Sequence, residues 1–188
     1  MQRVRRFGVA VCLVVLVAAN ASAQGATGGG QAAMSPKSLY ERLGGLDAIT
    51  AVTDEFIKIL AADERINKKL AKSDGPRVRL HFIEFVCVQT GGPCKYTGNS
   101  MKKTHKNMGV TDAEFTAGVE DLVKALDKFN VPTQERNELL NLLAPLKKEI
   151  VEVHSNATGT PLPDKFKPAP ALPKSQIDAG PAMKNKKP

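Results

Sequence analysis

Apolar residues recur three and four positions apart in four long stretches of this 188-residue chain, a period typical of α-helices with one buried face. No stretch shows the alternation of apolar and polar residues that indicates a half-buried β-strand. The stripes are Ile49, Val52, Phe56 and Leu60; Val78, Phe82, Ile83 and Val86; Phe115, Val119, Leu122, Val123, Leu126 and Phe129; and Leu139, Leu142, Leu143, Leu146 and Ile150. We therefore predict an all-α domain with four main helices.

Short motifs mark where these helices begin and end. They are the capping boxes Ser38 with Glu41 and Thr111 with Glu114, the start Asp74-Gly75-Pro76 and the stop Gly91-Gly92-Pro93. Between residues 91 and 110 the helical period weakens, and a loop of this length in a compact domain is usually functional.

Residues 1–23 have the features of a secretory signal peptide. Three arginines precede an apolar run that is short for a membrane span, and Ala21-Ser22-Ala23 follows as a small-residue cleavage pattern. We expect cleavage near Ala23, so that the mature chain begins at Gln24 and is periplasmic or secreted, with no stable membrane insertion. An uncleaved anchor is the alternative.

Composition divides the rest of the chain into three parts. Residues 24–37 are rich in glycine and alanine and predict a flexible lead-in, whereas residues 38–153 carry the helical stripes and predict the folded domain. Residues 154–188 contain seven of the twelve prolines and little apolar surface to bury, which predicts a disordered tail.

Charge and aromatic content argue against nucleic acid as a partner. The formal net charge is +8, but loss of three arginines with the signal leaves 24 basic residues against 19 acidic ones, a net charge of +5. These charges form no basic stripe. The chain has no tryptophan and two tyrosines, too few for a platform that stacks single-stranded bases.

Two cysteines, Cys87 and Cys94, remain after loss of the signal, and between them Thr90-Gly91-Gly92-Pro93 must turn the chain. In an oxidising compartment a disulfide across this turn is one expectation, and a pair of thiols is the other. No sequence motif of a metalloprotease, a phosphate-binding loop or a hydrolytic nucleophile is present.

Two histidines on separate segments, His81 and His105, are the strongest candidates for chemistry. Each is weak evidence alone, because a single histidine beside an apolar face is usually a packed residue. Together, facing an interior rich in phenylalanine and methionine, they can ligate one metal from opposite sides. Haem iron suits such a site, because it takes axial imidazole nitrogens and its flat ring needs an apolar cage.

The sequence resembles the group I truncated haemoglobins, small globins with a two-over-two helical sandwich. The resemblance spans nearly all of residues 38–153. The residues that carry it are Leu39-Tyr40-Glu41-Arg42-Leu43-Gly44-Gly45, Phe56, Gly91-Gly92-Pro93, Tyr96-Thr97-Gly98, Met101-Lys102-Lys103-Thr104-His105, Val110-Thr111, Phe115, Val131-Pro132 and Ala144-Pro145-Leu146.

This resemblance implies that His105 is the proximal ligand of the iron in haem b. It also implies that Lys102 or Lys103 faces a propionate. The implied cofactor contacts are Phe56, Ile57, Leu70, Val78, Phe82, Tyr96, Met101, Lys102, Met108 and Phe115.

On the distal side the sequence departs from the family pattern. Ile57 stands where tyrosine commonly follows the phenylalanine equivalent to Phe56, and Phe82 stands where glutamine is frequent. Leu70 replaces a usual phenylalanine, and Val78 occupies an expected gate position. Ile57 and Phe82 cannot donate a hydrogen bond to a bound gas, so we expect faster ligand release than from a polar pocket.

His81 aligns with a position from which some cyanobacterial members supply a second histidine ligand. Three roles remain open for it: ligation of iron, a polar contact with a ligand or propionate, and an ordinary surface position. If His81 ligates iron, a gas must first displace it, which lowers the apparent affinity.

The main functional hypothesis is reversible binding of a diatomic gas, oxygen or nitric oxide, at haem iron. The alternative is a bis-histidine haem protein for electron transfer or for redox or gas sensing, which would need a redox partner. A third hypothesis is a globin fold that has lost haem and acts as an interaction module. Nitric oxide dioxygenase or peroxidase activity would be a side activity of the haem.

Overall fold

The computed structural model describes residues 36–184, so the predicted signal peptide and residues 24–35 of the lead-in lie outside the described residues. Within 36–184 the regular structure is helical, apart from two isolated β-bridges. No helix of this part is long and apolar enough to cross a bilayer. The elements are α1 (Leu39–Arg42), α2 (Gly45–Ala62), the 3-10 helix η1 (Asn67–Leu70), α3 (Gly75–Gln89), α4 (Met101–His105), α5 (Asp112–Lys128), α6 (Thr133–Leu143), the 3-10 helix η2 (Ala144–Leu146), α7 (Lys147–Ile150) and α8 (Lys174–Ala179).

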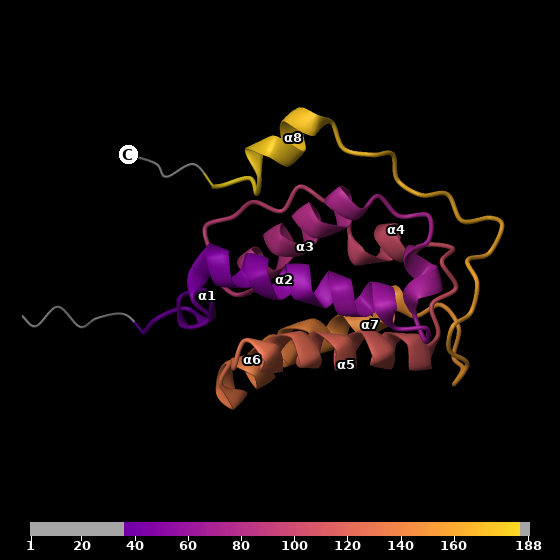
Figure 1. Cartoon of the computed structure of the whole chain (residues 1–188), viewed down its shortest axis with the longest axis horizontal. Helices are drawn as coiled ribbons and strands as arrows, with labels where there is room; N and C mark the ends of the chain where they lie inside the picture. Colours follow the sequence, from indigo (N-terminus) through magenta and orange to yellow (C-terminus); the bar gives the residue numbers. More distant parts are fainter. Residues whose placement is uncertain (1–35, 185–188) are drawn as a thin grey trace, which may run out of the picture. The chain divides into compact units, whose positions relative to one another are not determined.

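The core lies where the four predicted stripes meet. Helix α2 packs against both α3 and α5 and lies between them in Figure 1, while α6 packs against α1 and α5. Apolar side chains from α2, α3, α5 and α6 share one buried cluster that includes Ile49, Phe56, Ile83, Val86, Leu122, Leu126 and Leu139. The all-α prediction is therefore confirmed, and its helix-period residues form the core.

The predicted caps fix the helix starts. Ser38 Oγ accepts a hydrogen bond from the amide of Glu41 over 3.2 Å, and the Glu41 carboxylate accepts one from the amide of Ser38 over 2.8 Å. Thr111 and Glu114 make the same reciprocal pair at the start of α5. At α3 the Asp74 carboxylate accepts from the amide of Arg77. Each cap satisfies amides that have no partner inside the helix.

A disulfide joins Cys87, near the end of α3, to Cys94 in the following loop, so the first of the two expectations for these cysteines is confirmed. The turn between them needs glycine at position 92, because a Cβ there would lie 2.6 Å from Sγ of Cys87. The disulfide ties the helix that carries His81 to the loop that leads to α4 and His105.

Residues 154–184, for which we expected a disordered tail, contact the folded domain in this structure, and we call them the C-terminal strap. In Figure 1 this segment runs from α7 past the other helices to α8. Its Phe166 is 8% exposed, and its Met183 forms an isolated β-bridge with Cys94. Proline-rich composition correctly indicates little apolar burial. The strap is held instead by one aromatic side chain and by backbone hydrogen bonds to the folded domain.

Candidate functional site

A cavity of about 590 Å³ lies between α3, α4, α5 and the C-terminal strap. Its volume is within the range of about 300–1,000 Å³ that cofactor pockets occupy. Both candidate histidines, His81 and His105, line it. The other predicted residues that line it are Phe56, Leu70, Val78, Phe82, Tyr96, Met101, Met108 and Phe115.

Two residues predicted to contact the cofactor lie outside this lining. Ile57 is half-buried elsewhere on α2, and its neighbour Phe56 lines the cavity instead, because one residue turns a helix by about 100°. Lys102 is exposed and its amide donates to Glu149 over 3.3 Å, while Lys103 lines the cavity. The distal wall attributed to Ile57 is therefore formed by an aromatic ring.

His105 is the last residue of α4 and has a fixed orientation. Its Nδ1 lies 2.9 Å from the backbone oxygen of Met101. Because a carbonyl oxygen only accepts, Nδ1 carries the proton and Nε2 carries the lone pair. Burial lowers the pKa of His105, an effect that the Met101 hydrogen bond and the Glu152 charge partly oppose. The neutral imidazole with a bonded Nδ1 is the form in which histidine ligates a metal.

The chain turns sharply just after His105, and hydrogen bonds to the charged side chains of Glu152 and Lys69 hold this turn. The Glu152 carboxylate accepts from the amides of Asn107 and Gly109, each over 2.7 Å. The Lys69 ammonium donates to the carbonyls of Met108 (3.0 Å) and Gly109 (3.1 Å). Sequence reasoning missed both residues, because neither belongs to an apolar stripe or a cap.

Lys69 is buried, and its counter-charge comes from Glu114. The side chains are 4% and 0% exposed, and Nζ of Lys69 lies 3.4 Å from Oε2 of Glu114. The other oxygen of Glu114, Oε1, accepts from the amide (2.8 Å) and hydroxyl (2.6 Å) of Thr160 in the strap. The capping residue of α5 therefore also neutralises the lysine that holds the His105 turn.

On the opposite segment, His81 lies among polar groups. Its Nδ1 is 3.3 Å from Oε2 of Glu84 and 3.4 Å from Oγ1 of Thr97, and its Nε2 is 3.5 Å from Nη1 of Arg77. Its side chain is 13% exposed, so most of the ring is covered by protein. A donor to Glu84 at Nδ1 leaves the Nε2 lone pair toward Arg77.

Glu84 is buried and ionised. Burial alone would raise its pKa, but hydrogen bonds from the amide of Ala182, from Thr97 and from His81 together hold the pKa below its ordinary value. The Thr97 amide and hydroxyl donate over 2.9 and 2.7 Å, and the Ala182 amide over 3.0 Å. A carboxylate with this many donors stays charged although water does not reach it.

The charged residues of the cavity lining are mostly basic. They are Lys69, Arg77, Lys103, Lys106 and Lys167, with Asp74 as the acidic exception. Lys69 is paired with Glu114, which leaves Arg77 and three lysines facing the site. An apolar cavity with a basic margin suits a flat apolar molecule that carries carboxylates.

The donor set also decides which kind of metal the site can hold. Among residues 36–184 no three His, Cys, Asp or Glu side chains converge as a metal cluster. A bare zinc ion would need such a cluster. An iron already held by four porphyrin nitrogens needs one or two axial imidazoles, which His105 and His81 can provide. The residues present therefore fit haem.

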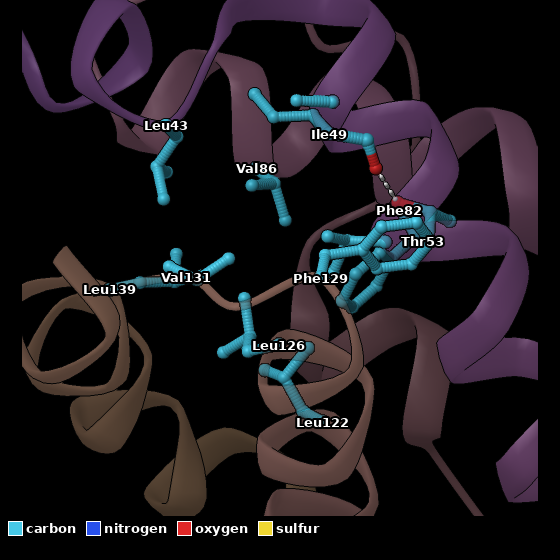
Figure 2. A pocket seen from close by; sticks show the side chains of 12 residues that line it. Leu43, Ile49, Thr53, Phe82, Val86, Leu122, Leu126, Phe129, Val131 and Leu139 are labelled. Atoms are coloured by element: carbon cyan, nitrogen blue, oxygen red, sulfur yellow. Dashed lines mark hydrogen bonds between the residues drawn. The ribbon is translucent and has the colours of Figure 1, made fainter. Parts of the chain in front are cut away.

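A second, smaller cavity of about 190 Å³ adjoins the first (Figure 2). Phe82 and Leu122 line both cavities. Its walls are apolar side chains except for Thr53, whose hydroxyl donates to the carbonyl of Ile49 over 2.7 Å, drawn as a dashed line in Figure 2. With its polar group satisfied, this space favours small apolar molecules over water.

Comparison with known proteins identifies the family to which this chain belongs. The model of the bacterial-like globin family matches residues 38–152. The chain belongs to the bacterial-like globin family. Its globin domain is 34% identical to the group 1 truncated hemoglobin GlbN of Mycolicibacterium paratuberculosis over 115 residues, which are 61% of this chain and 85% of that protein. It is 35% identical over 99 residues to GlbN of Synechocystis, with coverage of 50% and 80%.

Solved globin structures agree with this assignment. The Fe(III) form of truncated hemoglobin from Tetrahymena pyriformis superposes with a TM-score of 0.59 at 29% identity, covering 61% of this chain and 98% of that one. A group II truncated hemoglobin from Bacillus anthracis superposes with a TM-score of 0.57 at 19% identity, which shows the shared fold alone. The chain is thus a group 1 truncated globin with the two-over-two fold, and the C-terminal strap lies beyond the matched region.

Proposed function

We propose that this globin binds haem b in the larger cavity, with His105 as the proximal iron ligand, and that it reversibly binds a diatomic gas there. The observation that carries the proposal is the imidazole of His105, whose Nδ1 is bonded to Met101 and which lines an apolar cavity. The two cysteines of the described part are joined to each other, so neither supplies a thioether to the porphyrin. This supports haem b over a haem that is linked through cysteine thioethers.

Haem in its ferrous state supplies the capacity to bind oxygen or nitric oxide. His105, whose ring is held by Met101, would bind the iron, and the rings of Phe56, Phe82 and Phe115 in the cavity lining would keep water away from it. Arg77 is the polar side chain of the lining that can donate a hydrogen bond to a gas, because the ring proton of His81 is already directed to Glu84. Tyr96 is not, because its hydroxyl already donates to the carbonyl of Asn99 over 2.6 Å. The smaller cavity offers an apolar space in which a gas can reside next to Phe82.

Optical spectra of the ferric, ferrous and carbon monoxide-treated protein test this proposal. We expect a Soret band in the protein supplied with haem, and loss or strong weakening of haem retention in His105→Ala. His154→Ala is the matched control, since His154 is 88% exposed and does not line the cavity. A colourless wild-type protein, or unchanged pigment in His105→Ala, would contradict the proposal and favour a haem-free interaction module.

A second candidate is a bis-histidine haem protein for electron transfer or redox sensing. The observation that favours it is that His81 lines the same cavity and, like His105, has its Nδ1 bonded, here to Glu84. Arg77 opposes it, because its guanidinium faces the Nε2 that would bind iron. A low-spin ferric spectrum that turns high-spin in His81→Ala supports this candidate. A high-spin wild-type spectrum, unchanged in His81→Ala, leaves His81 as a polar neighbour of the gas.

We also propose that the chain is exported to the periplasm or secreted. Residues 1–23 support this with their signal-like pattern, and so does the Cys87–Cys94 disulfide, because structural disulfides persist mainly in oxidising compartments. Mass spectrometry of the protein from separated periplasmic, cytosolic and culture fractions is the test. We expect a chain that begins at Gln24 outside the cytosol. An intact chain from Met1 confined to the cytosol contradicts the proposal.

A further inference from the structure

We propose that the C-terminal strap is a built-in wall of the cofactor site, with Phe166 as its anchor and Lys167 as a cation for a carboxylate of the cofactor. This inference rests on the proposed haem-binding function. The segment from Phe166 to Pro170 lines the larger cavity together with the globin residues. The family match ends at residue 152, so the strap is an addition to the globin domain. The Tetrahymena structure, 98% of which is covered by this chain, leaves almost no room for a counterpart.

Both ends of the strap are bonded to buried carboxylates. Near its start, the amide and hydroxyl of Thr160 donate to Glu114, and near its end the amide of Ala182 donates to Glu84. Glu84 lies on α3 and contacts His81 of the same helix. Glu114 lies on α5 and neutralises Lys69, which holds the turn after His105. The strap is therefore fixed to the helix that carries His81 and, through Glu114 and Lys69, to the turn that follows His105.

Between these ends the strap packs against residues that line the cavity. Phe166 is 8% exposed and packs in an apolar cluster with Met108, Val110 and Phe115, all of which line the cavity. Further along, the carbonyl of Pro170 accepts from Nε of Arg77 over 2.8 Å. Because Arg77 also lies 3.5 Å from His81, the strap holds the guanidinium that faces this histidine.

The charge of the strap suits a cofactor with acidic groups. Lys167 is exposed and lines the cavity on the strap, while Lys103 and Arg77 line it from α4 and α3. An ammonium or guanidinium group near a carboxylate of the cofactor gains a charge-assisted hydrogen bond. Haem carries two propionates, so a cation on the strap would hold the cofactor in place and close its exit past Phe166.

The test measures how fast the haem-loaded protein loses haem to an excess of an apoglobin acceptor, followed by the Soret band. We expect Phe166→Ala to raise the loss rate about tenfold, which corresponds to about 1.4 kcal/mol. We expect Lys167→Gln to raise it about threefold, with a smaller difference at high salt because exposed charges are screened. Matched controls are Leu142→Ala, 41% exposed and in the lining of neither cavity, and Lys165→Gln, exposed and not in the lining, both with wild-type rates.

If Phe166→Ala folds poorly, amide hydrogen exchange of the full wild-type chain, with and without haem, still tests whether haem contacts the strap. We expect haem to slow exchange over residues 163–172 of the wild-type protein, and Phe166→Leu to lose haem at an intermediate rate. Wild-type loss rates in Lys167→Gln and Phe166→Leu, with no haem-dependent protection of the strap, overturn the inference while haem binding stands. A wild-type chain that takes up no haem refutes the proposed function itself.

Discussion

Loss of the carboxylate of Glu114 should destabilise the protein more than loss of any exposed charge, because it leaves the Lys69 ammonium buried without a counter-charge. The two side chains are 0% and 4% exposed, and their charged atoms lie 3.4 Å apart. Removing one partner of a buried ion pair typically costs about 3–5 kcal/mol. We expect this cost for Glu114→Ala, which also removes the acceptor of Thr160 and one of the two hydrogen bonds of the α5 capping box.

The reverse change should cost less. In Lys69→Met the Glu114 carboxylate keeps three donors, the amide of Thr111 and the amide and hydroxyl of Thr160, so it is not left uncompensated. The carbonyls of Met108, Gly109 and Pro161 and the hydroxyl of Thr160 lose this donor. None of them carries a net charge, so the cost is about 1–3 kcal/mol where one of them stays buried without a partner. The double variant Lys69→Met with Glu114→Gln buries no charge, so it should cost at least about 1 kcal/mol less than the sum of its single variants.

Urea unfolding followed by circular dichroism measures these free energies, with the wild type and all variants in the same cofactor state. In thermal unfolding, Glu114→Ala should have a melting temperature about 10 °C lower than the wild type. The exposed pair Lys174–Asp178 of α8, at 2.7 Å with side chains 85% and 58% exposed, is the matched control. Its double-mutant cycle should give at most about 0.5 kcal/mol. A coupling energy for Lys69 and Glu114 no larger than that of the α8 pair would refute the reasoning.

Three further perturbations follow from the same contacts. Hydrogen bonds from Arg65 hold the pKa of Asp63 at about 2, below the ordinary 3.8. The ionised Asp63 therefore stabilises the fold above pH 4, and this contribution is lost as the pH falls toward 2. We expect Asp63→Asn to lower the free energy of unfolding by about 1 kcal/mol at neutral pH, because Arg65 is partly exposed, and this difference from the wild type should vanish in acid titrations. The double change Cys87→Ser with Cys94→Ser opens a short loop and should cost about 2 kcal/mol in urea unfolding, whereas a reducing agent should leave that variant unaffected. Glu84→Ala leaves the donors of Thr97 and Ala182 buried without an acceptor, so it should lower the free energy of unfolding by about 2–4 kcal/mol. It should also speed amide hydrogen exchange at the end of the strap, and exchange there at the wild-type rate would contradict this.

Local signals predicted the fold because they act within a few residues. A capping box satisfies helix amides three positions away, so Ser38 and Thr111 could be identified from the sequence alone. The apolar stripes likewise depend on one helix at a time, and they match the buried cluster shared by α2, α3, α5 and α6. These features needed no knowledge of which helices meet.

The site could be predicted only as far as helix phase is certain. His105, His81 and eight of the ten expected contacts line one cavity, and the other two, Ile57 and Lys102, lie outside the lining. Ile57 follows Phe56 directly, and a step of one residue on a helix is enough to leave the cavity. The buried charges Lys69, Glu84 and Glu114 were missed as site residues, because their partners lie 13 to 98 positions away. Charged side chains of this kind look like surface residues in the sequence, and only the fold shows their partners.

The strap was the largest omission, and its contacts show how it affects the site. Proline prevents helix formation over most of residues 154–184, so the segment has no period to detect. Apart from the Thr160 hydroxyl, the strap bonds to the buried carboxylates through backbone amides, which any sequence provides. Each of its bonded ends shares a carboxylate with one histidine segment, through Glu84 for His81 and through Glu114 and Lys69 for His105. If the strap contacts the cofactor, the two stabilise each other by the same free energy. Cofactor binding then favours docking of the strap as much as docking of the strap favours cofactor binding. A variant that frees either end should then weaken cofactor binding without any change in the residues that line the cavity.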